Sequence, residues 1–242
     1  MNSLPYFRFN GGVSLDEQLI ITGKSVYKGA SRDISFTSIP GRSGDLLTDN
    51  KRYKNVKIEY SVCALSGIHD IPEIAHRVKG WLLSEVGYFE LYDTYDPNYF
   101  RLAAYSEEYN LEQELPALGK SKITFNCKPF RYSIEGQRAI TITGAATIRN
   151  PEYFPALPYI KITGSGNVTL SINNASYTFT GIDGYIEIDS EKMQAYKGTT
   201  NENSKMTTNE EKPFPEFSKG DNNISWSGTV TALEIVPRWC CL

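Results

Sequence analysis

Two short stretches of the chain contain the last three residues of a phosphate-binding loop. Gly-Lys-Ser occurs at 23–25 and again at 119–121. A loop that wraps phosphate groups with its backbone has the pattern GxxxxGK[ST], so it needs another glycine five residues before the Gly-Lys pair. Gln18 and Glu114 occupy those two positions. Both stretches are therefore predicted to be ordinary turns.

A third stretch resembles the nucleophile of a serine hydrolase. Residues 41–45 read GRSGD, whereas the turn that exposes a catalytic serine reads GxSxG, and Asp45 stands where the last glycine is required. The residues that follow lead into a strand and not into the helix of that motif. The two histidines, His69 and His76, lie around the start of a predicted helix, and nothing places either near Ser43. We therefore do not predict a hydrolase.

The chain offers few ligands for a metal ion or a redox centre. Its four cysteines contain no CxxC pair, and only two histidines are present. A tetrahedral zinc site needs four converging ligands, so we expect no metal, no cofactor and no enzyme. A glycosidase site, which needs two carboxylates in a cleft, remains an alternative at this point, because the sequence does not show which carboxylates lie close together.

Composition and charge narrow the class of protein further. The 242 residues are 40% hydrophobic and 22% charged, which suits packed cores in one large or two ordinary domains. The net charge is −3, and without a basic face we expect no sequence-specific binding of nucleic acid. No run approaches the roughly 18 consecutive apolar residues that cross a bilayer, and the first residues lack a secretion signal. We predict no membrane insertion and synthesis in a cytoplasm.

Residues 1–132 are predicted to form a mainly β domain with a single helix. In the segment 53–62, apolar and polar residues alternate, which predicts a strand with one buried face. Strands of this domain are expected at 6–9, 19–22, 34–37, 53–62, 88–92, 99–105 and 122–129.

The helix is expected at 70–87, where apolar residues recur every three or four positions. Asp70 is placed to cap its first turn, and Gly87 to stop its last turn in a left-handed conformation. Trp81 and Leu82 lie on the apolar stripe. We predict that they anchor the helix to the sheet, and a position in the core is the simplest interpretation of both.

Residues 133–242 are predicted to form a second β domain. Short alternating segments with turn residues between them are typical of a β-sandwich or jelly roll. The segment 196–214 has hardly any large apolar residues, so it is predicted to be a long exposed loop. Strands of this domain are expected at 168–172, 177–179, 185–189 and 224–237. The predicted fold class is therefore mainly β throughout.

Several stretches, taken in order, resemble the distal tail protein (Dit) family of siphophage tail tips. The first is SIPGRSGDLLTDNKRYKNVKIEYSV at 38–62, which leads from one strand to the next. The order and spacing of the stretches carry the resemblance more than any single motif. The others are IPEIAHRVKGWLLSEVGYFELYD (71–93), DPNYFRLAAY (96–105), KITFNCKPFRY (122–132), IDGYIEIDSEKMQAYKG (182–198) and FPEFSKGDNNISWSGTVTALEIVPRW (214–239).

The resemblance implies a structural protein of the virion tail tip. The first domain, 1–132, would have the tail-tube fold and form a homo-hexameric ring around a channel, and the second, 133–242, would be galectin-like. The ring would join the tail-tube protein to the tail-associated hub or baseplate proteins, with the tape-measure and receptor-binding proteins as further possible partners. DNA would pass through the channel without being read. Assembly would take place in the cytoplasm of the bacterial host.

Within this frame we predict that Pro40–Tyr53 is an extended arm that contacts the adjacent protomer. Arg42 and Asp45 would supply charged contacts, and Gly41 and Gly44 would allow a tight backbone. Tyr53 would end the arm. The alternative is a hairpin loop exposed to solvent.

A second function class is binding of host-surface carbohydrate by the C-terminal domain. An apolar sugar face stacks on an aromatic ring, and the candidate rings are Tyr177, Tyr185, Tyr196 and Trp226. The second half of the chain has no histidine, so the compact polar cluster expected of galectins is not recognisable. A galectin-like fold does not by itself imply sugar binding.

Overall fold

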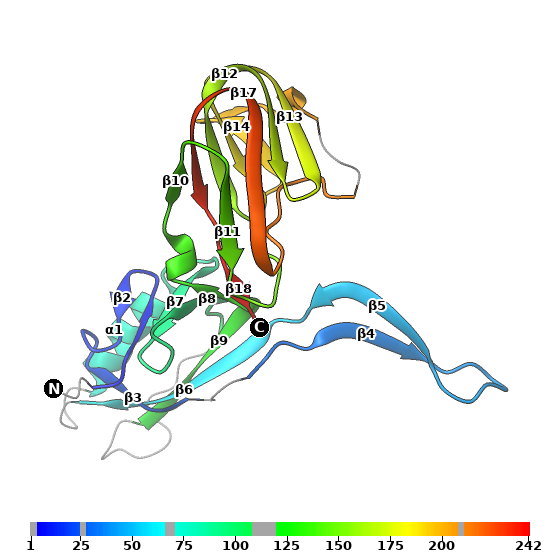
Figure 1. Ribbon diagram of the computed structural model, residues 1–242. Coiled ribbons are helices and arrows are strands. Elements are labelled where there is room, and N and C mark those ends of the chain that lie inside the picture. Colours follow the sequence, from blue (N-terminus) through cyan, green and yellow to red (C-terminus); the bar gives the residue numbers. More distant parts are fainter. Residues whose placement is uncertain (1–3, 25–27, 66–70, 108–119, 208–210) are drawn as a thin grey trace. The chain divides into compact units, whose positions relative to one another are not determined.

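The computed structural model describes residues 4–24, 28–65, 71–107, 120–207 and 211–242. The chain folds into two compact units (Figure 1). Unit 1 comprises Met1–Arg131 with Leu242, and unit 2 comprises Tyr132–Cys241. Each unit has its own cluster of buried apolar side chains. That the first is a ring-forming domain and the second galectin-like stays a prediction.

The main element of unit 1 is a sheet with strand order β2-β1-β7-β8-β9-β6-β3. In β6, alternate side chains from Val56 to Val62 are at most 5% exposed, which confirms the predicted period of two. The strands are β1 (Phe7–Phe9), β2 (Gly12–Val13), β3 (Leu19–Lys24), β6 (Val56–Ala64), β7 (Phe89–Asp93), β8 (Tyr99–Ala104) and β9 (Lys120–Ser133).

The predicted helix is present as α1, Ile71–Leu83. Ile74, Ala75, Val78 and Leu82 form its buried stripe and pack into the core of unit 1. The predicted stop at Gly87 is wrong, because the helix ends four residues earlier and Gly87 has no positive φ. Val86 is fully exposed, so there is no apolar contact to continue the helix through that turn. The predicted cap, Asp70, lies outside the described residues.

A separate two-stranded sheet is formed by β4 (Arg32–Thr37) and β5 (Leu46–Tyr53). It is an antiparallel hairpin inserted in the chain between β3 and β6. The prediction that a strand runs from Tyr53 through residue 62 is wrong, since β5 ends at Tyr53 and β6 begins at Val56. Residues 46–53 were predicted as part of an arm and not as a strand, because neither of their faces is buried and no alternation marks them.

Unit 2 is dominated by three long antiparallel strands. They are β12 (Tyr159–Ile172), β13 (Ala175–Asp189) and β17 (Gly220–Val236), and β12 lies between the other two. Its shorter elements are η2 (Glu135–Gln137), β10 (Ile140–Ile142), β11 (Ala146–Asn150), β14 (Gln194–Lys197), β15 (Thr200–Asn201), η3 (Asn203–Lys205), β16 (Met206–Thr207) and β18 (Cys240–Cys241). The predicted fold class, mainly β, is confirmed.

Two local predictions for unit 2 are wrong. Residues 185–189 are not a separate strand but the end of β13, which continues through Gly181 and Gly184 at positive φ. Residues 196–214 are not one exposed loop, because β14, β15, η3 and β16 occupy much of that segment. β16 pairs with β13, with Met206 opposite Phe179, and the buried Met206 side chain holds the segment on the core.

No helix among the described residues is long and apolar enough to span a membrane.

Candidate functional site

The exposed hairpin of unit 1, residues Arg32–Tyr53, contains the predicted arm and is called the arm below. Its root is fixed by charges. Arg52 donates to Asp33 at 2.7 Å, and the Lys54 ammonium lies 3.4 Å from the same carboxylate. The hydrogen bond from Arg52, helped by Lys54, lowers the pKa of Asp33 although burial opposes it. Tyr53 lies under the Arg32 guanidinium, at 5.1 Å, and its ring meets that of Phe130 at 5.6 Å.

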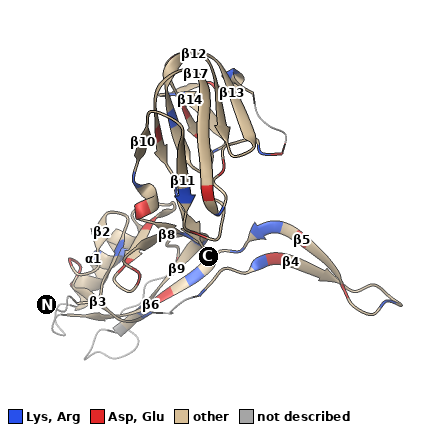
Figure 2. Ribbon diagram, in the orientation of Figure 1, with Lys and Arg blue, Asp and Glu red and all other residues tan. Residues whose placement is uncertain are grey.

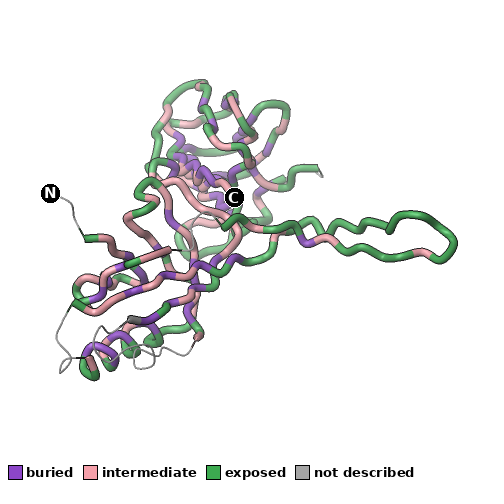
Figure 3. The backbone as a smooth tube through the Cα atoms, turned by 90° about the horizontal axis from the view of Figure 1, so that it is seen from below, coloured by how far each residue is buried: buried purple, intermediate pink, exposed green. Residues whose placement is uncertain are grey.

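Beyond its root, the arm exposes large apolar side chains. Phe36 is 65% exposed, Leu46 47% and Leu47 55%. Phe36 and Leu47 are register partners on neighbouring strands, so their side chains share one face of the hairpin. Figure 3 shows the distal part of the hairpin as exposed apart from one half-buried segment, at Ile39. Apolar side chains gathered on an isolated hairpin are typical of a surface that another molecule covers.

The tip of the arm combines a tight turn with two unpaired charges. The amide of Arg42 donates to the carbonyl of Ile39 at 3.1 Å, and Gly41 has a φ of +79°. Proline followed by a glycine at positive φ is the signature of a type II turn, here at Pro40 and Gly41. Gly44 also has a positive φ, +89°. Within the described chain, Arg42 and Asp45 form no ion pair.

Charge is distributed unevenly along the arm. Figure 2 shows basic and acidic residues on both strands near the root and mainly uncharged residues beyond them. The root is therefore held by ion pairs within the chain. The distal half offers an apolar face and, at the tip, one cation and one anion.

A second surface of unit 1, not predicted from the sequence, is a shallow groove of about 280 Å³ at β1 and β7. We call it the β1–β7 groove. Above it the Arg8 guanidinium lies 5.8 Å from the centre of the Tyr92 ring, and the Tyr92 hydroxyl donates to Glu90 at 2.8 Å. Burial, with this hydrogen bond, raises the pKa of Tyr92 to about 12. The groove is lined by Arg8, Phe9, Asn10, Gly11, Phe89, Glu90 and Tyr92.

The predicted helix anchor lies in the core of unit 1. The Trp81 indole donates to the carbonyl of Phe9 at 2.9 Å and stacks on Phe7, with ring centres 5.5 Å apart. Leu82 is 1% exposed. A Cβ atom on Gly12 would collide with the indole, so only glycine fits where β2 passes it. These contacts hold α1 against β1.

We expect Leu82→Ala to destabilise unit 1 by about 2–5 kcal/mol, because it removes buried methyl groups and leaves a cavity. Leu83→Ala is the matched control, since Leu83 is the next residue of the same helix and is 50% exposed. Its effect should stay within about 0.5 kcal/mol. Urea unfolding of the two variants measures the difference. Equal unfolding midpoints would contradict the assignment of Leu82 to the core.

The four candidate sugar-binding aromatics of unit 2 do not form one platform. Tyr177 is 1% exposed and donates to the carbonyl of Phe214, so its prediction as a glycan contact is wrong. Tyr185 has two lysine ammonium groups near its ring, Lys161 at 4.6 Å and Lys197 at 5.4 Å. Tyr196 is half-buried on β14. The half-buried Trp226 packs against the core from β17.

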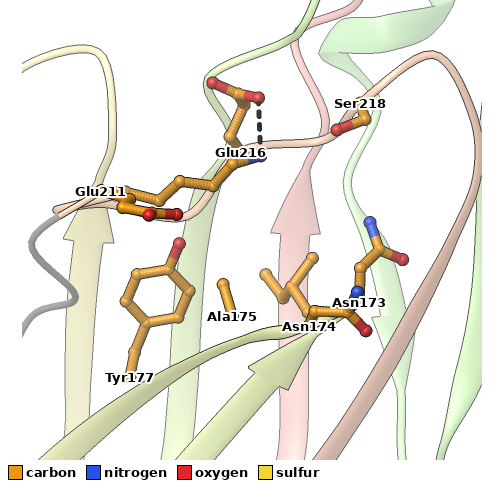
Figure 4. A pocket seen from close by; sticks show the side chains of 9 residues that line it. Asn173, Asn174, Ala175, Tyr177, Glu211, Glu216 and Ser218 are labelled. Atoms are coloured by element: carbon orange, nitrogen blue, oxygen red, sulfur yellow. Dashed lines mark hydrogen bonds and ion pairs between the residues drawn. The ribbon is translucent and has the colours of Figure 1, made fainter.

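A pocket of about 300 Å³ lies in unit 2 between the β12–β13 turn and residues 211–218 (Figure 4). Its wall contains Asn173 and Asn174 from the turn, and the Lys212 ammonium bonds Glu216 across it at 3.2 Å. Tyr177 is its only aromatic lining residue among those described, and that ring belongs to the core. The pocket therefore lacks the exposed ring that sugar stacking needs.

Asp189, the last residue of β13, forms a buried ion pair with Arg238. Arg238 binds Asp189 through two hydrogen bonds, of 2.7 and 3.1 Å, and the Asp189 side chain is 1% exposed. Burial alone would raise the pKa of Asp189, but the hydrogen bonds and charge of Arg238 lower it below its usual value. The amide and ammonium of Lys192 add to this. The pair is structural, and no group of three or more metal-ligating side chains occurs among the described residues.

The chain shares its fold with one phage protein of known structure. Along 99% of its length it matches the crystal structure of SPP1 Dit (gp 19.1), described as a paradigm of the hub adsorption apparatus in phages that infect Gram-positive hosts. The match covers 100% of that chain, with a TM-score of 0.74 at 10% identity. The resemblance predicted from the sequence is therefore confirmed for the fold.

Two structures of the phage P2 baseplate in its activated conformation also match. The one with Ca has a TM-score of 0.48 at 13% identity, and the one with Sr has 0.46 at 12%. Both matches cover 96% of this chain and 98% of the other. No family model and no curated protein matches the sequence.

Proposed function

We propose that this chain is a distal tail protein of a siphophage, a structural component of the virion tail tip. In this proposal unit 1 forms a homo-hexameric ring that joins the tail tube to the hub or baseplate proteins and lines a channel for DNA. Unit 2 is the galectin-like domain. The likeness of the whole chain to SPP1 Dit supports this assignment.

The observation that carries the proposal is the arm. It exposes Phe36, Leu46 and Leu47, which make no core of their own. An isolated hairpin of two strands is marginally stable in water, so an ordered one that presents apolar residues favours a partner that covers it. In a cyclic ring one patch of each chain meets a different patch on its neighbour, and a projecting arm suits that geometry.

The proposal predicts that the purified chain forms a ring at micromolar concentration. Mass photometry should detect a particle of six times the 27.2 kDa chain mass, and negative-stain electron microscopy should show an axial hole. A particle of another closed stoichiometry with a hole would correct the number of chains only. A monomer at every concentration tested would contradict the proposal.

A further inference from the structure

We propose that unit 1 contains a buried site for one small monovalent anion of the size of chloride, beside Arg101. The site is a cavity of about 20 Å³, where the turn from β7 to β8 lies against β6 and β9. All of its lining residues belong to unit 1 of a single chain, so the inference does not depend on the proposed ring. The charged residues that line it are Lys24, Asp93, Asp96, Arg101 and Arg131.

Both carboxylates of the site are already paired with a cation. Asp93 Oδ2 lies 2.7 Å from the Lys24 ammonium and accepts a hydrogen bond of 2.6 Å from the Tyr60 hydroxyl. Asp96 accepts a hydrogen bond of 2.8 Å from Arg131. Because the cavity is lined by three cations and two carboxylates, these pairs leave one positive charge without a counter-charge.

That remaining charge is on Arg101, in β8. Its Nη2 atom donates to the carbonyl of Lys28 over a long 3.4 Å, and its buried Nη1 atom has no hydrogen-bond partner among the described residues. Burial lowers the pKa of Arg101, and the positive charge of Arg131 acts in the same direction. A buried charge without a partner is strongly destabilising, so an anion beside these two guanidinium groups would stabilise unit 1.

The size of the cavity selects the kind of anion. A cavity that holds one water molecule needs roughly 10–15 Å³, so about 20 Å³ suits a single-atom ion and is too small for phosphate or sulfate. A water molecule would accept the hydrogen bond from Arg101 but would leave its charge unbalanced. A halide does both, and hydrogen bonds between charged groups are roughly twice as strong as those between neutral groups.

Hydrogen exchange in chloride and in gluconate, at equal ionic strength, tests the site. The amides of Tyr95, Asp96 and Tyr99 are hydrogen-bonded in the turn from β7 to β8, and opening this turn would release the anion. At a chloride concentration ten times its dissociation constant, they should exchange about tenfold more slowly than in gluconate. Arg101→Met should abolish this difference. Arg8→Met, the same change on an exposed residue of β1, is the matched control and should preserve it.

A crystal of the wild-type chain grown in sodium bromide locates the anion without any variant, so the test stands even where Arg101→Met fails to fold. We expect an anomalous peak within hydrogen-bond reach of Arg101 Nη1. No peak there, with equal exchange in the two salts, would show that water fills the cavity and would overturn the proposal. A peak without slower exchange would mark an adventitious ion only and would overturn it as well. Neither result bears on the proposed function, which the ring assay tests separately.

Discussion

Replacing Phe36 and Leu47 with serine is expected to convert rings into single chains without unfolding either unit. Both side chains are more than half exposed and lie outside both hydrophobic cores. Burying a large apolar side chain fully contributes about 1.5–3 kcal/mol, and a neighbour that covers the arm would recover part of this at every contact of the ring. Mass photometry before and after the change measures the fraction of chains in rings.

The matched control is Ser35→Ala with Thr48→Ala. These two residues are also register partners, on the same two strands, but they lie on the other face of the hairpin. This variant should form rings as the wild type does. Thermal unfolding of the two variants, compared at a dilution at which both are single chains, should be the same, because neither face of the arm contributes to a core. Rings of wild-type stability after Phe36→Ser and Leu47→Ser would show that the arm does not carry the contact.

The second large effect is expected in unit 2, where Arg238→Ala should cost about 3–5 kcal/mol of stability. The change leaves the Asp189 carboxylate buried without the two hydrogen bonds from Arg238, and removing one partner of a buried ion pair is strongly destabilising. Arg149→Ala is the matched control, because Arg149 and Asp221 are 3.1 Å apart with side chains 75% and 60% exposed. An exposed pair is worth at most about 1 kcal/mol. Urea unfolding of unit 2, followed by a probe specific to it, compares the two.

The ion pair of Asp189 and Arg238 also predicts how the free energy of unfolding changes with pH. In the wild type the folded pKa of Asp189 lies below its unfolded value of about 3.9, so the unfolded chain binds more protons in acid. The stability from this group is therefore present above about pH 4 and is lost as the pH falls through the folded pKa. In Arg238→Ala only the amide and ammonium of Lys192 still oppose burial, so the carboxyl pKa rises and the stability that this group gains between acid and neutral pH becomes smaller. The same slope in both proteins would contradict the role given to Arg238.

The parts of the fold that the sequence predicted are those in which burial imposes a period. Alternation from Val56 to Val62 predicts β6 because one face of that strand is buried, and recurrence at three and four residues predicts α1 for the same reason. β5 has no such signal, since almost all of its side chains are exposed. The end of α1 was misplaced because the expected glycine stop depends on a backbone conformation that Gly87 does not adopt.

The candidate site was predictable only in part. The glycines and charged residues after Pro40 indicate an exposed turn, and the arm was predicted at Pro40–Tyr53. The β1–β7 groove has no comparable signal, because Arg8 and Tyr92 become neighbours only through the pairing of β1 with β7. The burial of Tyr177 has no sequence signal either, because it depends on which face of β13 packs on the core.

The exposed arm also affects how readily proteases cleave the chain before assembly. Its backbone bonds are confined to a two-stranded ladder, and its side chains are exposed from Ser35 to Thr48 apart from Ile39. Such a segment opens locally at low cost, and exposed loop tips are preferred sites of proteolysis. Among the described residues, a protease would therefore cut an unassembled chain at the arm before it cut either core. In the proposed ring a neighbour would cover this cleavage site, so assembled chains would outlast those made in excess.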